Sequence, residues 1–113
     1  MTRLGYVIMF VDDVDQAIAF YRDVVGLPLC FHTPEWSEFD TGSTTLALHE
    51  ATPESPAGTL KLGLQVPDLD AFHARLSERS VVFTRAPVEQ HGQRLAEFRD
   101  PLGAQVSVSS PLR

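Results

Sequence analysis

The side chains best suited to metal or acid–base chemistry are spread along the chain instead of forming one compact motif. His49, Glu38 and Glu97 together supply one imidazole and two carboxylates, which is a chemically possible set of ligands for a divalent metal. Lys61 lies within a leucine-rich run, where loss of hydration would make it a general base or a clamp for an anionic ligand. A structural alternative is an ion pair between Lys61 and Glu38 or Glu97, or a place for Lys61 at a solvated rim.

Two aromatic side chains, Tyr6 and Trp36, offer a different chemistry, because aromatic faces stack on planar or cationic ligands. The same two rings are equally suited to packing at a dimer interface. Cys30 has no base that the sequence can assign to it, so we expect a small core residue and no nucleophile.

The other histidines are weaker candidates for metal ligands. We expect His73 to border the core of a helix, and we expect His32 and His91 to lie near loops.

Length, charge and cysteine content restrict the protein class. The chain has 113 residues, enough for one domain with its own core. Its formal net charge is −6, with 15 acidic and 9 basic residues, which argues against binding to nucleic acid. A single cysteine excludes an internal disulfide, and no apolar run is long enough to cross a membrane, so we expect a cytoplasmic protein.

The clearest of the elements that must position these side chains lies at residues 13–29, where we expect an amphipathic helix followed directly by a strand. Asp13 and Gln16 have the spacing of a capping box, and Gly26 supplies the left-handed end. Val14, Ala17, Ile18, Tyr21 and Val25 form one apolar stripe along this helix. We expect strands at residues 4–11, 27–31, 35–40 and 44–50 around it.

The chain then repeats the same order of elements. Residues 66–70, V-P-D-L-D, correspond to residues 11–15, V-D-D-V-D, and each segment begins a helix after a strand. Strict alternation predicts a strand from residue 60 to residue 66, and further strands are expected at 81–84, 94–99 and 104–109. The sequence therefore predicts an α+β domain of two tandem βαβββ modules, residues 1–50 and 59–113, joined by a linker at 51–58.

Several motifs resemble those of the vicinal oxygen chelate superfamily. This superfamily includes glyoxalase I, bleomycin-resistance proteins and extradiol dioxygenases. They are F-Y-R-D-V-V-G-L-P-L at residues 20–29, the repeated V-x-D-[VL]-D segment, and F-R-D-P-L-G at residues 98–103. The resemblance covers nearly the whole chain. It implies two curved mixed sheets around a cup, with the helices on the convex side, and it does not specify an activity.

Strand alternation predicts which side chains face this cup. If Val7, Met9 and Leu46 pack under the helix, their sequence neighbours point the other way. The predicted ligand-binding residues are Tyr6, Ile8, Trp36, Glu38, Ala47, His49, Lys61, Gly63, Glu97, Gln105 and Ser107. The same alternation adds Phe10, Gln65, Leu95 and Ser109.

The resemblance also implies where metal-dependent members carry their ligands, namely in the first and last strands of each module. Those positions hold Tyr6, Ala47, Lys61 and Ser107, which do not form the carboxylate and imidazole set that an oxygen-chelating metal needs. The ammonium group of Lys61 would repel the ion. We therefore expect no metal and no other cofactor.

The favoured function is a metal-independent small-molecule binding protein, of the kind that sequesters a drug or metabolite. Two short modules with open sheet edges predict a homodimer that completes each cup. One alternative is a glyoxalase I-like lyase or a dioxygenase that uses His49 and cup carboxylates around nickel, zinc or iron. The other is a metal-free lyase or isomerase with Lys61 or Glu97 as general base.

Overall fold

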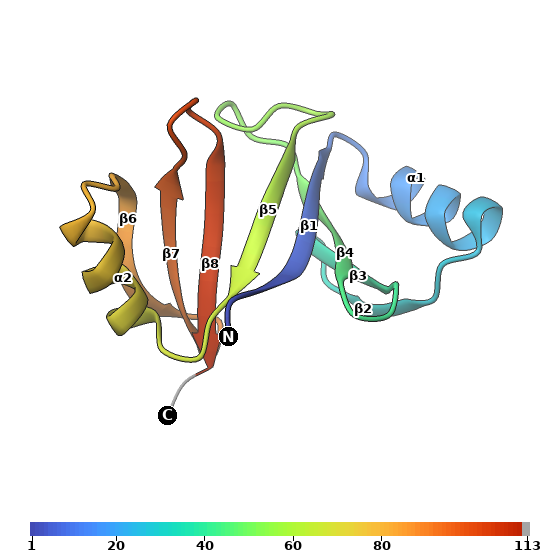
Figure 1. Ribbon diagram of the computed structural model, residues 1–113. Coiled ribbons are helices and arrows are strands. Elements are labelled where there is room, and N and C mark those ends of the chain that lie inside the picture. The colour runs from blue at the N-terminus through green and yellow to red at the C-terminus, as the bar shows by residue number, and fades with distance from the viewer. Residues whose placement is uncertain (112–113) are drawn as a thin grey trace. The chain divides into compact units, whose positions relative to one another are not determined.

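The computed structural model describes residues 1–111, and it confirms the predicted α+β class with two βαβββ modules. The described chain divides into two compact units, residues 5–60 and residues 61–111 together with residues 1–4. Each contains one mixed four-stranded sheet and a helical segment (Figure 1). No helix in the described part of the chain is long and apolar enough to cross a bilayer.

The unit of residues 5–60 has the strand order β2-β3-β4-β1. Its strands are β1 (Arg3–Val11), β2 (Leu29–His32), β3 (Trp36–Asp40) and β4 (Thr45–Glu50). β1 and β4 run parallel, whereas the pairs β3–β4 and β2–β3 are antiparallel. A parallel pair needs a long connection, and the helical segment and the β2–β3 hairpin together provide it.

The helical segment of this unit changes its winding partway along. α1 (Val14–Ala19) is an α-helix, and a π-helix, η1 (Phe20–Val25), continues it. Asp13 caps the start by accepting a hydrogen bond from the Gln16 amide at 2.9 Å, and Gly26 ends the segment at φ +92°. The extra residue in the π turn rotates Val25 out of the predicted apolar stripe, and Val25 is 51% exposed.

The second unit has the strand order β5-β8-β7-β6. Its elements are β5 (Leu60–Gln65), α2 (Leu69–Glu78), β6 (Phe83–Gln90), β7 (Gln93–Arg99) and β8 (Gln105–Pro111). β5 and β8 are parallel and the other pairs antiparallel, as in the first unit. β6 extends six residues beyond the predicted end at residue 84, because Pro87 lies on an outer strand, where a missing amide donor is tolerated.

Each helix covers one face of its own sheet. Ile18 of α1 packs with Phe39 and Leu48, and Met9 and Val11 border this cluster. Leu69 and Phe72 of α2 pack with Val66, Ala96 and Val108 in the second unit. The predicted alternation is therefore correct for these strands, because Met9, Leu46 and Leu48 all lie under the helical segment.

Cys30 differs from its predicted place in the core. It is exposed, and its thiol donates to the backbone oxygen of Glu38 at 3.3 Å. β2 pairs only with β3 among the described strands, so this outer strand is covered less than the sequence pattern suggests.

The core under α1 generates a stability prediction. Leu48→Ala removes a fully buried side chain, and we expect it to lower the free energy of unfolding by about 2 to 5 kcal/mol, from lost burial and the cavity left behind. Leu102→Ala is the matched control, because Leu102 is 96% exposed. Urea unfolding of both variants measures the effect, and equal stabilities would contradict this placement of the core.

Candidate functional site

The face of the first sheet that points away from α1 carries most of the predicted ligand-binding residues. Strand register places Trp36 beside His49 and places His49 beside Phe10, so these side chains form one row across β3, β4 and β1. In the next row, Glu38 lies beside Ala47, and Ala47 beside Ile8. Three separate strands therefore supply one continuous surface.

Aromatic rings meet at close range on this surface. The ring centroids of Tyr6 and Trp36 lie 6.0 Å apart at an interplanar angle of 64°. His49 lies 6.0 Å from Trp36 and 5.1 Å from Phe10. The Trp36 indole Nε1 donates a hydrogen bond to Glu38 Oε2 at 2.7 Å, which fixes the indole and holds a carboxylate beside the rings. We call Tyr6, Phe10, Trp36, His49 and Glu38 the aromatic group.

Ala47 forms the base of the aromatic group. It is fully buried and belongs to a cluster with Ile8 and Phe10, against which Tyr6 and Trp36 pack. Tyr6 lies on β1 and Trp36 on β3, with β4 between them, so the residue at this point of β4 must be small for the two rings to meet. A larger side chain at position 47 would occupy that space.

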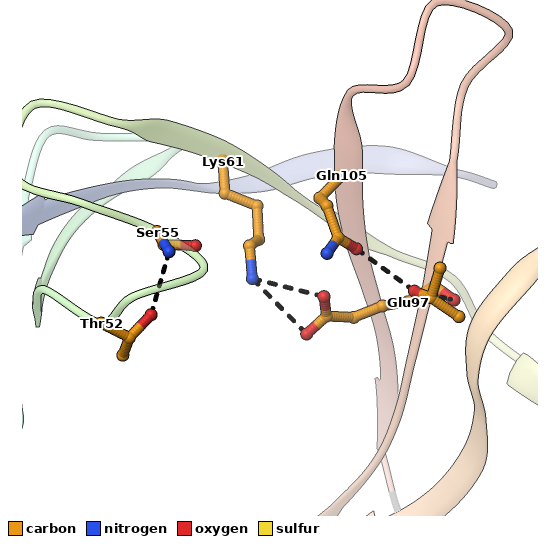
Figure 2. Close-up of polar contacts among 6 residues, drawn as sticks. Thr52, Ser55, Lys61, Glu97 and Gln105 are labelled. Atoms are coloured by element: carbon orange, nitrogen blue, oxygen red, sulfur yellow. Dashed lines mark hydrogen bonds and ion pairs between the residues drawn. The ribbon is translucent and has the colours of Figure 1, made fainter.

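In the second unit, the face away from α2 is polar. Lys61 Nζ lies 3.3 Å from Glu97 Oε1 and 3.5 Å from Oε2, and both side chains are largely buried, at 14% and 23% exposure (Figure 2). Register places Ser107 between Gly63 and Glu97 on this face. The ion pair predicted as the alternative for Lys61 is therefore present, and Glu97 is its partner.

Gln105 has a partner that the sequence did not indicate. The Thr84 hydroxyl lies 3.2 Å from Gln105 Oε1 and 3.4 Å from the backbone oxygen of Glu97. Thr84 is absent from the predicted site residues because the alternation of cup-facing side chains was not extended to the short strand predicted at residues 81–84. The alternation of β6 was the signal that would have revealed it.

Two of the remaining histidines, His73 and His32, have local partners, and His91 lies in a turn. The ring centroids of His73 and Phe83 lie 4.5 Å apart in an edge-to-face arrangement, in keeping with a place for His73 beside the α2 core. His32 Nδ1 lies 2.8 Å from the hydroxyl of the buried Ser37. His91 occupies the turn between β6 and β7 at φ +53°.

The donor chemistry does not fit a divalent metal. Of the four positions where metal-dependent relatives are expected to carry ligands, Ala47 has no donor atom and Lys61 carries a positive charge. His49 Nδ1 lies 2.7 Å from the backbone oxygen of Glu50, and Glu38 accepts from Trp36. Within residues 1–111, no three His, Cys, Asp or Glu side chains come close enough together to hold a metal ion.

Comparison with known proteins identifies the family. Residues 3–108 match the model of the Glyoxalase/Bleomycin resistance protein/Dioxygenase superfamily. The chain belongs to this superfamily. The resemblance predicted from residues 20–29 and 98–103 is therefore confirmed.

Relatives and solved structures support the same fold. Uncharacterized protein YraH of Bacillus subtilis is 28% identical over 116 residues, covering 88% of this chain and 91% of YraH. A hypothetical protein, BH1468 from Bacillus halodurans, has a TM-score of 0.84 at 17% identity, covering 99% of this chain and 96% of its own. Methylmalonyl-CoA epimerase from Mycobacterium tuberculosis has a TM-score of 0.82 at 20% identity, and the match covers 97% of this chain and 88% of the epimerase chain.

The poor fit to a metal generates a direct prediction. Protein purified without a nickel column should contain less than stoichiometric nickel, zinc or iron by plasma mass spectrometry. Addition of these ions should leave its melting temperature unchanged, because few suitable donors converge. Stoichiometric metal that disappears in His49→Ala, but persists in the control His91→Ala, would contradict the prediction.

Proposed function

We propose that this protein is a metal-independent small-molecule binding protein of the superfamily. The observation that carries the proposal is the aromatic group, in which Tyr6 and Trp36 meet over the small, buried Ala47 and Glu38 lies beside the indole. Metal chemistry would need carboxylate or imidazole ligands at positions where this chain has Tyr6, Ala47 and Lys61. The same arrangement is well suited to binding a ligand.

The chemistry of the aromatic group indicates the class of ligand. Aromatic faces attract planar rings by stacking and attract cations through the ring quadrupole. Glu38 adds an anionic acceptor at the same place, since its carboxylate hydrogen bonds to Trp36 and remains available to a donor on a ligand. A planar ring system that carries an N–H donor or a positive charge matches both features, and the expected role is sequestration of a drug or metabolite of this kind.

The polar face of the second unit supports binding more than catalysis. Both carboxylate oxygens of Glu97 face Lys61 Nζ, so each charge already has its counter-charge. A general base at either position would first have to break this ion pair. Gly63, Gln105 and Ser107 on the same face add small and neutral polar groups suited to hydrogen bonding a ligand.

We further propose that both modules act as one cytoplasmic domain, residues 1–113, and that the protein is a homodimer. The outer strands β2 and β6 each have one edge that no described strand pairs with. Phe31 on β2 is 51% exposed. An exposed apolar side chain on an open strand edge favours association with another chain. A second copy of the chain is the simplest partner for that edge.

The dimer proposal predicts a sedimentation result. In analytical ultracentrifugation at micromolar concentration, the wild-type protein should sediment with twice the mass of one chain. Phe31→Glu should shift the protein to monomer, because it places a charge in the proposed contact. Leu102→Glu, at another exposed leucine, should remain dimeric. A wild-type monomer would contradict the proposal.

The binding proposal has a built-in reporter, because Trp36 is the only tryptophan in the chain. Planar heteroaromatic amines should quench its fluorescence in a saturable way. Trp36→Ala should weaken binding of such a compound by about 1 to 3 kcal/mol in calorimetry, from lost stacking and buried area. Trp36→Phe should weaken it less, because a ring remains.

Phe20→Ala is the matched control for this experiment. Phe20 is an exposed aromatic residue on η1, 49% exposed, and lies outside the aromatic group. Its removal should leave affinity unchanged. A compound that quenches Trp36 but binds Trp36→Ala with wild-type affinity would exclude stacking, and a library without any saturable quencher would overturn the proposed ligand class.

A further inference from the structure

The aromatic group contains a second hydrogen-bond acceptor besides Glu38, on the side chain of His49. The Nδ1 atom of His49 lies 2.7 Å from the backbone oxygen of Glu50. A carbonyl oxygen can only accept a hydrogen bond, so in the neutral ring Nδ1 carries the proton. The other ring nitrogen, Nε2, therefore has a free lone pair. The main chain of β4 thus sets the tautomer of an imidazole that lies against two aromatic rings.

The Nε2 atom of His49 is open to a ligand. Within residues 1–111, the ring of His49 contacts Trp36 and Phe10, and its hydrogen bond is the one made by Nδ1. In that same part of the chain, the buried side-chain nitrogen or oxygen without a partner is Arg94 Nε. Nε2 of His49 has no partner and is not such an atom, so solvent reaches it. The same reasoning applies to Oε1 of Glu38, whose Oε2 accepts from the indole.

Strand register places these two acceptors on either side of Trp36. Trp36 and Glu38 are two residues apart on β3, so their side chains point to the same face. His49 lies directly beside Trp36 on the neighbouring strand β4, which makes Glu38 and His49 diagonal neighbours. Diagonal neighbours have Cα atoms about 7 to 8 Å apart. One planar ring system stacked on the indole can therefore reach both acceptors.

Both acceptors are oriented before any ligand arrives. The indole N–H holds the Glu38 carboxylate at 2.7 Å, and the Glu50 backbone oxygen holds the His49 ring at the same distance. Groups that are already ordered lose little side-chain entropy on binding. The two acceptors differ in charge, because one is a carboxylate and the other is a neutral imidazole nitrogen.

We propose that the ligand of the aromatic group is a planar cation with two separate N–H donors, one for Glu38 and one for Nε2 of His49. This inference rests on the proposed binding function and narrows its ligand class. Stacking on Trp36 favours the ring system, and the carboxylate favours its positive charge. His49 determines specificity for the second N–H, since an acceptor that loses its water without gaining a donor opposes binding.

Three matched cations test this proposal on the full chain. 4-Aminoquinolinium has a ring N–H and an amino group, 1-methyl-4-aminoquinolinium keeps only the amino group, and 1-methylquinolinium has neither donor. All three are planar and positively charged. Their dissociation constants, measured by quenching of Trp36 and by calorimetry in one slightly alkaline buffer, should rise in that order. Each lost donor should weaken binding by about two- to tenfold.

Variants assign the two donors to the two acceptors. His49→Phe keeps a ring and removes the acceptor, so it should weaken 4-aminoquinolinium by about two- to tenfold and leave 1-methylquinolinium unchanged. Glu38→Gln removes the charge and should weaken 4-aminoquinolinium at least about tenfold. His91→Asn is the control. It removes an imidazole from a turn outside the aromatic group, at a left-handed φ that asparagine tolerates, and should change none of the constants.

A measurement without ligand tests the tautomer directly. Long-range ¹H–¹⁵N correlation spectra distinguish a protonated ring nitrogen from a bare one. The neutral ring of His49 should show a protonated Nδ1 and a bare Nε2, because Nδ1 donates to Glu50. The opposite tautomer would overturn the proposal.

The binding results separate this inference from the proposed function. Equal constants for the three cations, or equal weakening of all three by His49→Phe, would overturn the paired-donor ligand. If Trp36→Ala still weakened these cations, the proposed binding function would stand. Absence of saturable quenching by all three cations would also overturn the paired-donor ligand, whereas the proposed function is overturned only by failure of the wider library of planar amines.

Discussion

In each unit, a helix packs against one face of the sheet and thereby fixes where every strand side chain lies. In the first unit, Ile18, Phe39 and Leu48 exclude water on that face, and in the second Leu69 and Phe72 do so with Val108. Because strand side chains alternate with a period of two, covering one face fixes every residue on the other. A slip of one residue in either sheet would exchange the core for the candidate site.

This constraint leaves the opposite faces of the two sheets free of core packing against the helices, and the two modules carry different side chains there. In the first, Tyr6 and Trp36 meet over Ala47, and a carboxylate is held beside them by the indole N–H. In the second, Lys61 and Glu97 neutralise each other among small polar side chains. A duplicated framework thus presents an aromatic surface in one copy and a polar surface in the other.

Two of the 15 acidic residues have a structural role at the helix starts. Acidic residues cap both helices, since Asp13 accepts from the Gln16 amide and Asp68 from the Ala71 amide. These two carboxylates therefore contribute to the fold as well as to the net charge.

The order of elements, the internal repeat and the family could be predicted from the amino-acid sequence, because hydrophobic periodicity, helix caps and the motifs at residues 20–29 and 98–103 are local signals. It also predicted the face to which Trp36, Ala47 and Glu97 belong, since alternation needs no distant information. Three-dimensional packing was needed to show that Lys61 pairs with Glu97 and that Trp36 donates to Glu38. It likewise revealed the π turn that exposes Val25 and the open edge that exposes Cys30. These features depend on register between strands far apart in the chain and on local winding, neither of which composition or periodicity encodes.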